Sequence, residues 1–166
     1  TIVKYAPIAV AEPENYEARA NLMWTSSWAI NGFINGGKRK AWSCHPMEHE
    51  LSAIYDIAHG HGLAILTPRW MEYCLEESNA HRYVSLGVNV FGIDPKGEPM
   101  AIAKECIERM REFMSVTLNL PYTFTEVGIK REDFATMARK ACRYGAIRGF
   151  KTLEPQDVER IYEMCI

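Results

Sequence analysis

The strongest constraint on the fold is that apolar residues recur with the spacing of an α-helix in nearly every segment of the chain. No stretch of four or more residues between turn signals alternates apolar and polar side chains, the pattern that is typical of a half-buried strand. We therefore predict an all-α fold, a multi-helix bundle with at least seven helices and essentially no sheet. The expected helices span about residues 14–34, 45–58, 63–75, 83–91, 100–114, 134–141 and 158–165.

Glycine and proline residues indicate where these helices end or bend. The first expected helix, mostly buried, ends at Gly36-Gly37, and a short basic loop of residues 38–40 follows it. The second helix is expected to end before His59. A kink is expected at Thr67-Pro68, because proline removes a backbone donor, and Gly92 is expected to close the fourth helix.

Size and charge exclude several classes of protein. A chain of 166 residues can bury one core, and its 19 basic and 21 acidic residues give a net charge of −2, which does not favour a nucleic-acid partner. No apolar run reaches the roughly 18 residues of a membrane span, and no signal peptide is visible. The five cysteines are odd in number and form no CxxC motif, so we expect buried thiols and a cytoplasmic location.

Four of the five histidines lie within 17 positions: His45, His49, His59 and His61. His81 stands alone in a polar stretch, which favours a surface position. Histidine is the commonest metal ligand and a frequent proton shuttle, so this cluster is the candidate site.

The spacing of the histidines allows two different pairs to bind one metal ion. His45 and His49 are four residues apart and share one face of a helix, which favours them as a pair. His45 and His59 would also share a face, yet on one straight helix they would lie ~21 Å apart. They can meet only if the chain breaks before His59 and turns back, and Gly60 and Gly62 favour such a break.

Residues 42–60, WSCHPMEHELSAIYDIAHG, resemble the histidine signature of the iron-containing alcohol dehydrogenases, in particular the NAD(P)H-dependent butanol dehydrogenase branch. The flanking segments PENYEARANLMW at 13–24, AING at 29–32, LAI at 63–65 and PRWM at 68–71 are similar to the same branch. The resemblance is close over about residues 6–92 and looser to the end of the chain.

This resemblance implies a two-domain enzyme with a divalent metal, Fe²⁺ or Zn²⁺, in the cleft between a dinucleotide-binding domain and a helical C-terminal domain. Motif matching assigns the metal ligands to His45 and His59. It assigns His49 to a position beside the nicotinamide, as both a catalytic proton carrier and a cofactor-binding residue. His61 matches no ligand position and is expected to be structural or solvent-facing.

Two elements of the family pattern are absent from this sequence. The D-x-x-x-H pair that completes the metal site does not occur, and neither does the GGGS turn for the cofactor pyrophosphate. We therefore expect residues 1–166 to form a single helical C-terminal domain, a fragment without its N-terminal dinucleotide-binding domain. Such a fragment is expected to be inactive by itself and to hold no metal or a weakly bound ion.

The expected reaction of the intact enzyme is oxidation of a primary alcohol or reduction of an aldehyde, with NAD(P)H as the second substrate. The metal would polarise the carbonyl, and Trp24, Trp28 and Phe33 are candidates for the apolar side of the substrate cleft. A homodimer is one expected assembly of the enzyme. The alternatives are a helical metallohydrolase built on the His45/His49 face and a non-catalytic helical module.

Overall fold

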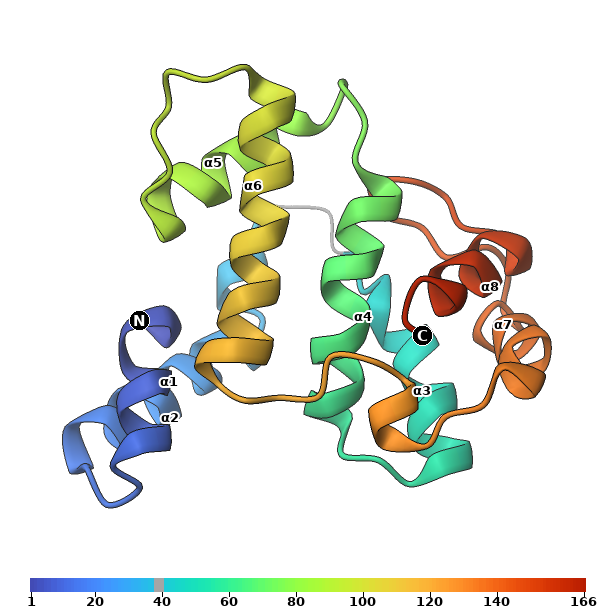
Figure 1. Cartoon of the computed structure of the whole chain (residues 1–166), viewed down its shortest axis with the longest axis horizontal. Helices are drawn as coiled ribbons and strands as arrows, with labels where there is room; N and C mark the ends of the chain where they lie inside the picture. The colour runs from blue at the N-terminus through green and yellow to red at the C-terminus, as the bar shows by residue number, and fades with distance from the viewer. Residues whose placement is uncertain (38–40) are drawn as a thin grey trace. The chain divides into compact units, whose positions relative to one another are not determined.

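The computed structural model describes residues 1–37 and 41–166, so the basic loop expected at 38–40 lies outside the described residues. Within that described part the chain forms eight α-helices and no strand, apart from an isolated antiparallel bridge between Ile147 and Leu153 (Figure 1). The prediction of an all-α fold with at least seven helices is confirmed. Two compact units make up the chain, Thr1–Lys40 and Ala41–Ile166. The expectation that residues 1–166 act as one domain stays a prediction.

The first unit is a pair of helices, α1 (Ile2–Ala11) and α2 (Tyr16–Ile30), followed by a 3₁₀ turn at Phe33–Asn35. The side chain of Asn15 caps α2, since its Oδ1 accepts a hydrogen bond from the amide of Ala18 over 3.0 Å. The sequence pattern did not predict α1, because Pro7 inside the helix interrupts the helical signal.

The helix expected at 14–34 is shorter and more exposed than predicted. It ends at Ile30 because Gly32 adopts a left-handed conformation, with φ of 84°. Only Ala18 of α2 is buried, whereas Tyr16 is 86% exposed and Ile30 81% exposed. The prediction of a mostly buried helix is therefore wrong for this chain, because apolar residues lie all round α2 and cannot all face α1.

The second unit contains the other six helices and an irregular connector after α6. Its helices are α3 (Cys44–Tyr55), α4 (His59–Cys74), α5 (Ala80–Phe91), α6 (Pro99–Glu112), α7 (Phe134–Ala141) and α8 (Pro155–Glu163). In Figure 1, α4 lies between α6 on one side and α3 with α8 on the other, and it packs against all three. Gly92, with φ of 69°, closes α5 as the sequence predicted.

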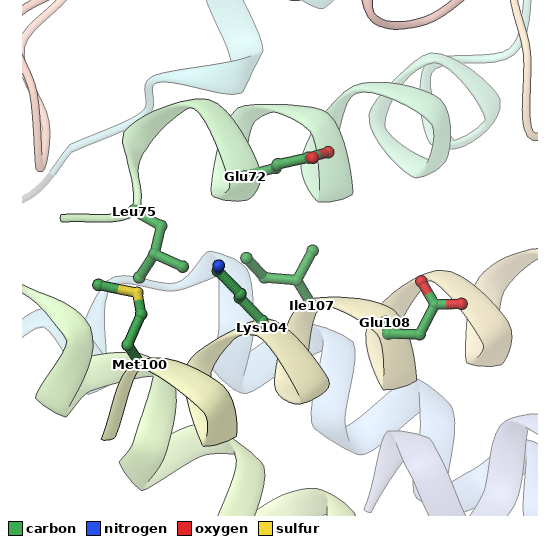
Figure 2. Close-up of a pocket in the computed structure, with 6 residues that line it drawn as sticks. All are labelled: Glu72, Leu75, Met100, Lys104, Ile107 and Glu108. Atoms are coloured by element: carbon green, nitrogen blue, oxygen red, sulfur yellow. The ribbon is translucent and has the colours of Figure 1, made fainter. Parts of the chain in front are cut away.

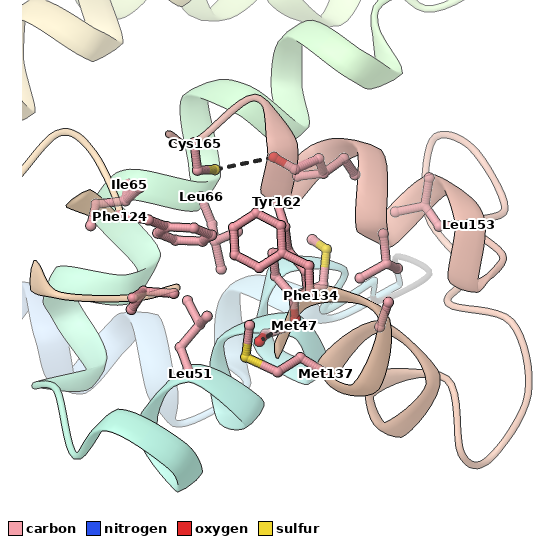
Figure 3. Close-up of a cluster of buried hydrophobic side chains, with 14 of the residues drawn as sticks. Met47, Leu51, Ile65, Leu66, Phe124, Phe134, Met137, Leu153, Tyr162 and Cys165 are labelled. Atoms are coloured by element: carbon pink, nitrogen blue, oxygen red, sulfur yellow. Dashed lines mark hydrogen bonds between the residues drawn. The ribbon is translucent and has the colours of Figure 1, made fainter. Parts of the chain in front are cut away.

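The larger core of this unit joins α3, α4, α7 and α8 (Figure 3). The aromatic rings of Phe124, Phe134 and Tyr162 meet at its centre, with centroids 5.6–5.8 Å apart. The Tyr162 hydroxyl donates a hydrogen bond to the carbonyl oxygen of Met47 over 2.8 Å. This buried bond connects α8 to the first turn of α3, so the larger core fixes the helix that carries His45 and His49.

A smaller core lies where α5 and α6 pack on α4, with Met71, Tyr83 and Cys106 among its members. A groove of about 420 Å³ opens between α4 and α6 (Figure 2). Its lining residues are Glu72, Leu75, Met100, Lys104, Ile107 and Glu108. No histidine lines this groove, so it is separate from the candidate site.

Helix α4 runs through Pro68 without interruption and starts four residues earlier than predicted. Pro68 removes the backbone donor for the carbonyl oxygen of Ala64, while the neighbouring Thr67 hydroxyl donates a hydrogen bond to the carbonyl oxygen of Leu63 over 2.6 Å. No helix among residues 1–37 and 41–166 combines the length and the hydropathy needed to cross a bilayer.

Candidate metal centre

Helix α3 carries most of the candidate site on one face. Glu48, His49 and Ser52 follow His45 by three, four and seven residues, which places all four along a single stripe of the helix. The ring centroids of His45 and His49 are 6.1 Å apart. The indole of Trp42 packs edge-on against His45, with centroids 4.3 Å apart and planes at 90°. The prediction that His45 and His49 share a helix face is confirmed.

The chain breaks between α3 and α4, as the sequence analysis expected. The break begins at Asp56, a non-glycine residue in the left-handed region with φ of 52°, and passes through the extended residue Ala58. Gly60 and Gly62 do not form the break, contrary to expectation, because both lie within the first turn of α4. The positive φ at Asp56 redirects the backbone, so α4 can start at His59 and pack beside α3.

This turn brings His59 to the histidines of α3. Its ring centroid lies 5.3 Å from that of His45 and 5.6 Å from that of His49. A continuous helix would have held His45 and His59 about 21 Å apart. The structure therefore unites both pairs that the sequence left open. His61, two residues after His59 in α4, makes none of these ring contacts, and His81 is exposed at the start of α5.

A buried carboxylate completes the group, although the family motif assigned it no role and the sequence offered it only as a candidate carboxylate of the metallohydrolase alternative. Glu48 is 0% exposed, and its Oε2 makes a direct hydrogen bond with Nδ1 of His59. Its Oε1 accepts a hydrogen bond from the Ser52 hydroxyl over 2.5 Å. Ligand atoms of Glu48, His49 and His59 lie within 4.8 Å of one another, a spacing at which they could surround an ion. The position of Glu48 three residues after His45, on the same helix face, is a sequence signal that could have identified it.

The environment of His45 favours the neutral form of its imidazole. The pKa of His45 is lowered, first by desolvation and then by the charges of His59 and His49, while Glu48 acts in the opposite direction. A neutral imidazole offers a lone pair, which is the form that binds a divalent ion. Three converging imidazoles and one carboxylate are a donor set that suits Zn²⁺ or Fe²⁺. The assignment of His45 and His59 as ligands and of His49 as the catalytic, cofactor-binding residue stays a prediction.

The aromatic residues proposed for the substrate cleft belong to the first unit. Trp28 makes edge-to-face contacts with Trp24 and Phe33, with centroids 5.5 Å and 4.8 Å apart. Trp24 is 65% exposed and Phe33 72% exposed, so this cluster presents an apolar surface instead of filling the interior of its own unit. Its role beside a substrate stays a prediction.

Comparison with known proteins identifies the family. Residues 1–166 match the sequence profile of the Fe-containing alcohol dehydrogenase family, C-terminal part. The chain is 49% identical to NADH-dependent butanol dehydrogenase A of Clostridium acetobutylicum over 98% of its own length and 42% of that protein. It is 29% identical to the NADPH-dependent aldehyde reductase YqhD of Escherichia coli, over 87% of this chain and 37% of that protein.

A solved structure agrees with these matches. The chain superposes on NADH-dependent butanol dehydrogenase A from Thermotoga maritima with a TM-score of 0.89 and 32% identity, covering 99% of this chain and 43% of that one. The chain thus spans less than half the length of the relatives that it matches. The match over all 166 residues and the shared helical fold lead to one conclusion: this chain belongs to the Fe-containing alcohol dehydrogenase family, of which it carries the C-terminal region.

Proposed function

We propose that this chain is the metal-binding helical part of an NAD(P)H-dependent alcohol dehydrogenase that acts on primary alcohols and aldehydes, such as butanol and butanal. The observation that carries the proposal is the convergence of His45, His49 and His59, from two helices, to centroid distances of 5.3–6.1 Å. The butanol dehydrogenases to which the chain is similar support the reaction and the substrate class.

The proposal gives each histidine a role. His45 and His59 bind a divalent ion through neutral imidazole nitrogens. When bound, the ion acts as a Lewis acid that polarises the carbonyl of an aldehyde or stabilises the alkoxide of an alcohol. His49, one helical turn from His45, receives the proton of the alcohol and passes it toward solvent, a task that suits an imidazole near neutral pH.

The nucleotide and the remaining ligands must come from outside residues 1–166. This chain lacks a glycine-rich turn for the pyrophosphate and has no D-x-x-x-H pair. We therefore propose that a dinucleotide-binding domain works with this chain, and that residues 1–166 alone have no dehydrogenase activity. Two imidazoles without an anionic partner ligand would hold the ion weakly.

The metallohydrolase alternative has less support. A metal pair on the His45/His49 face would need at least two free carboxylates nearby. Glu50 forms a salt bridge with Arg143 over 2.9 Å, and the Glu48 carboxylate is hydrogen-bonded to His59 and Ser52. The carboxylates of this face are therefore already engaged.

The test uses the full-length protein that contains this sequence. Wild-type protein should contain a divalent metal and oxidise NADH or NADPH in the presence of butanal. His45→Gln and His59→Gln should lose both metal and activity, while His49→Gln should keep the metal and lose about 10²-fold or more in kcat. His61→Gln is the matched control, since His61 lies in the same turn of α4 as His59, and it should behave like wild type. Normal metal content and activity in His45→Gln would refute the proposal.

A cytoplasmic location and a homodimer belong to the same proposal. All five cysteines are free thiols, and Cys74, Cys106 and Cys165 are buried, which suits a reducing compartment. Sedimentation of the full-length protein would measure whether two copies associate.

A further inference from the structure

Glu48 is a buried carboxylate that the proposed reaction does not use. We propose that Glu48 is a positioning residue: its carboxylate holds the His59 ring in the tautomer with hydrogen on Nδ1, so that Nε2 is free to bind the divalent ion. This inference rests on the proposed function, because it assigns His59 to the metal.

The contact between Glu48 and His59 is a hydrogen bond and not a pair of ligands on one ion. Two donor atoms that each lie ~2.1 Å from a tetrahedral ion are separated by about 3.4 Å. Oε2 of Glu48 and Nδ1 of His59 are in direct contact, closer than this separation, so an ion does not fit between these two atoms. With Glu48 ionised, its carboxylate only accepts hydrogen bonds, so in a neutral His59 ring Nδ1 carries the hydrogen and Nε2 has the lone pair.

Two further residues keep the Glu48 carboxylate in place. The Ser52 hydroxyl lies 2.5 Å from Oε1 of Glu48 and 3.1 Å from the carbonyl oxygen of Ile57, at the break between α3 and α4. On the other side, a Cβ atom at Gly62 would lie 2.7 Å from both Cγ and Oε1 of Glu48. Only glycine at position 62 leaves space for the Glu48 carboxylate. Helix α4 therefore provides both the His59 ring, to which Glu48 is hydrogen-bonded, and the space beside Gly62, which Glu48 occupies.

Burial makes this carboxylate costly unless it has a compensating partner. The side chain of Glu48 is 0% exposed, and among the described residues the His59 imidazole is the one basic side chain within salt-bridge distance of it. Glu50, also buried, has the guanidinium of Arg143 at 2.9 Å. A charge without such a partner is expensive to bury, and an ion bound on the far side of His59 would compensate it. A carboxylate behind a ligating histidine fixes its tautomer and strengthens it as a ligand.

The test compares Glu48→Gln with the matched control Glu50→Gln in the full-length protein. Both substitutions keep the volume and remove one buried negative charge from α3. Histidine-selective ¹⁵N NMR of the metal-free protein reports the tautomer, and competition with a chromophoric chelator reports the affinity for Zn²⁺. Glu48→Gln should populate the Nε2–H tautomer of His59, because an amide group can also donate to Nδ1. It should also weaken Zn²⁺ binding about 10–100-fold. Glu50→Gln should change neither.

A second pair of variants reaches the same contact from α4. Gly62→Ala should displace Glu48 and weaken Zn²⁺ binding like Glu48→Gln. Gly60→Ala, where a Cβ atom meets nothing within 4 Å, should leave the affinity unchanged.

The possible failures are distinguishable. Wild-type protein that binds no Zn²⁺ would refute the proposed function, while the tautomer comparison would still decide the role of Glu48. An Nε2–H tautomer in wild type, or wild-type Zn²⁺ affinity in Glu48→Gln, would overturn the inference and leave the proposed function standing.

Discussion

Gly60 and Gly62 are two residues apart in the first turn of α4, yet alanine should have opposite effects on stability at the two positions. At Gly60 a new methyl group would meet no heavy atom within 4 Å. At Gly62 it would lie 2.7 Å from Cγ and Oε1 and 3.1 Å from Cδ of Glu48. Glu48 cannot swing into solvent easily, because it is fully buried and hydrogen-bonded to Ser52.

The expected magnitudes follow from these contacts. Alanine in place of a helical glycine stabilises by about 0.5–1 kcal/mol, which is the whole effect expected for Gly60→Ala. Gly62→Ala has the same gain, but overpacking costs about 1–3 kcal/mol and a lost hydrogen bond to a charged group costs about 1.5–3 kcal/mol. Since the gain cancels between the two variants, we expect Gly62→Ala to be less stable than Gly60→Ala by about 2.5–6 kcal/mol.

Urea unfolding of the metal-free protein, followed by far-ultraviolet circular dichroism, measures this difference. The slope of free energy against urea should be the same for both variants, so that the midpoints can be compared directly. Equal midpoints for Gly60→Ala and Gly62→Ala would show that Glu48 is not packed against α4. They would refute the close approach on which the positioning role of Glu48 depends.

Three further predictions follow from other parts of the second unit. Asp56→Val should lower the free energy of unfolding by about 1–2 kcal/mol in urea titrations, whereas Asp56→Gly should not lower it, because only glycine adopts a positive φ without cost. Equal losses in the two variants would contradict the role of the positive φ at Asp56. Arg143→Ala should cost about 1–3 kcal/mol in the same assay, since it leaves the buried Glu50 carboxylate without its cation, and an unchanged midpoint would argue against the pair. Burial raises the pKa of Cys44 to about 12 and that of Cys106 to about 11, so a thiol reagent at about pH 8 should modify both slowly until the chain is unfolded. Since the ordinary thiol pKa is 9.0, the stability from these two thiols is complete below that pH and is lost as the pH rises through 11 to 12, which pH-dependent melting would detect.

The helical class and the His45/His49 pair could be read from the sequence because both depend on local spacing. Apolar periodicity is a property of each segment by itself, and residues four apart share a helix face whatever the helix packs against. The signature at residues 42–60 likewise identified the family before any contact was known. The break before His59 also follows from the sequence, although the expected cause, Gly60 and Gly62, differs from the observed one, Asp56.

Tertiary structure decided what lies around that signature. A left-handed Asp56, where glycine would have been expected, turns the chain so that His59 approaches His45. The burial of Glu48 and the need for glycine at position 62 appear only when α3 and α4 lie side by side. Periodicity along one helix cannot specify these features, because the approach of two helices depends on side chains far apart in sequence, such as Tyr162 bonded to the first turn of α3.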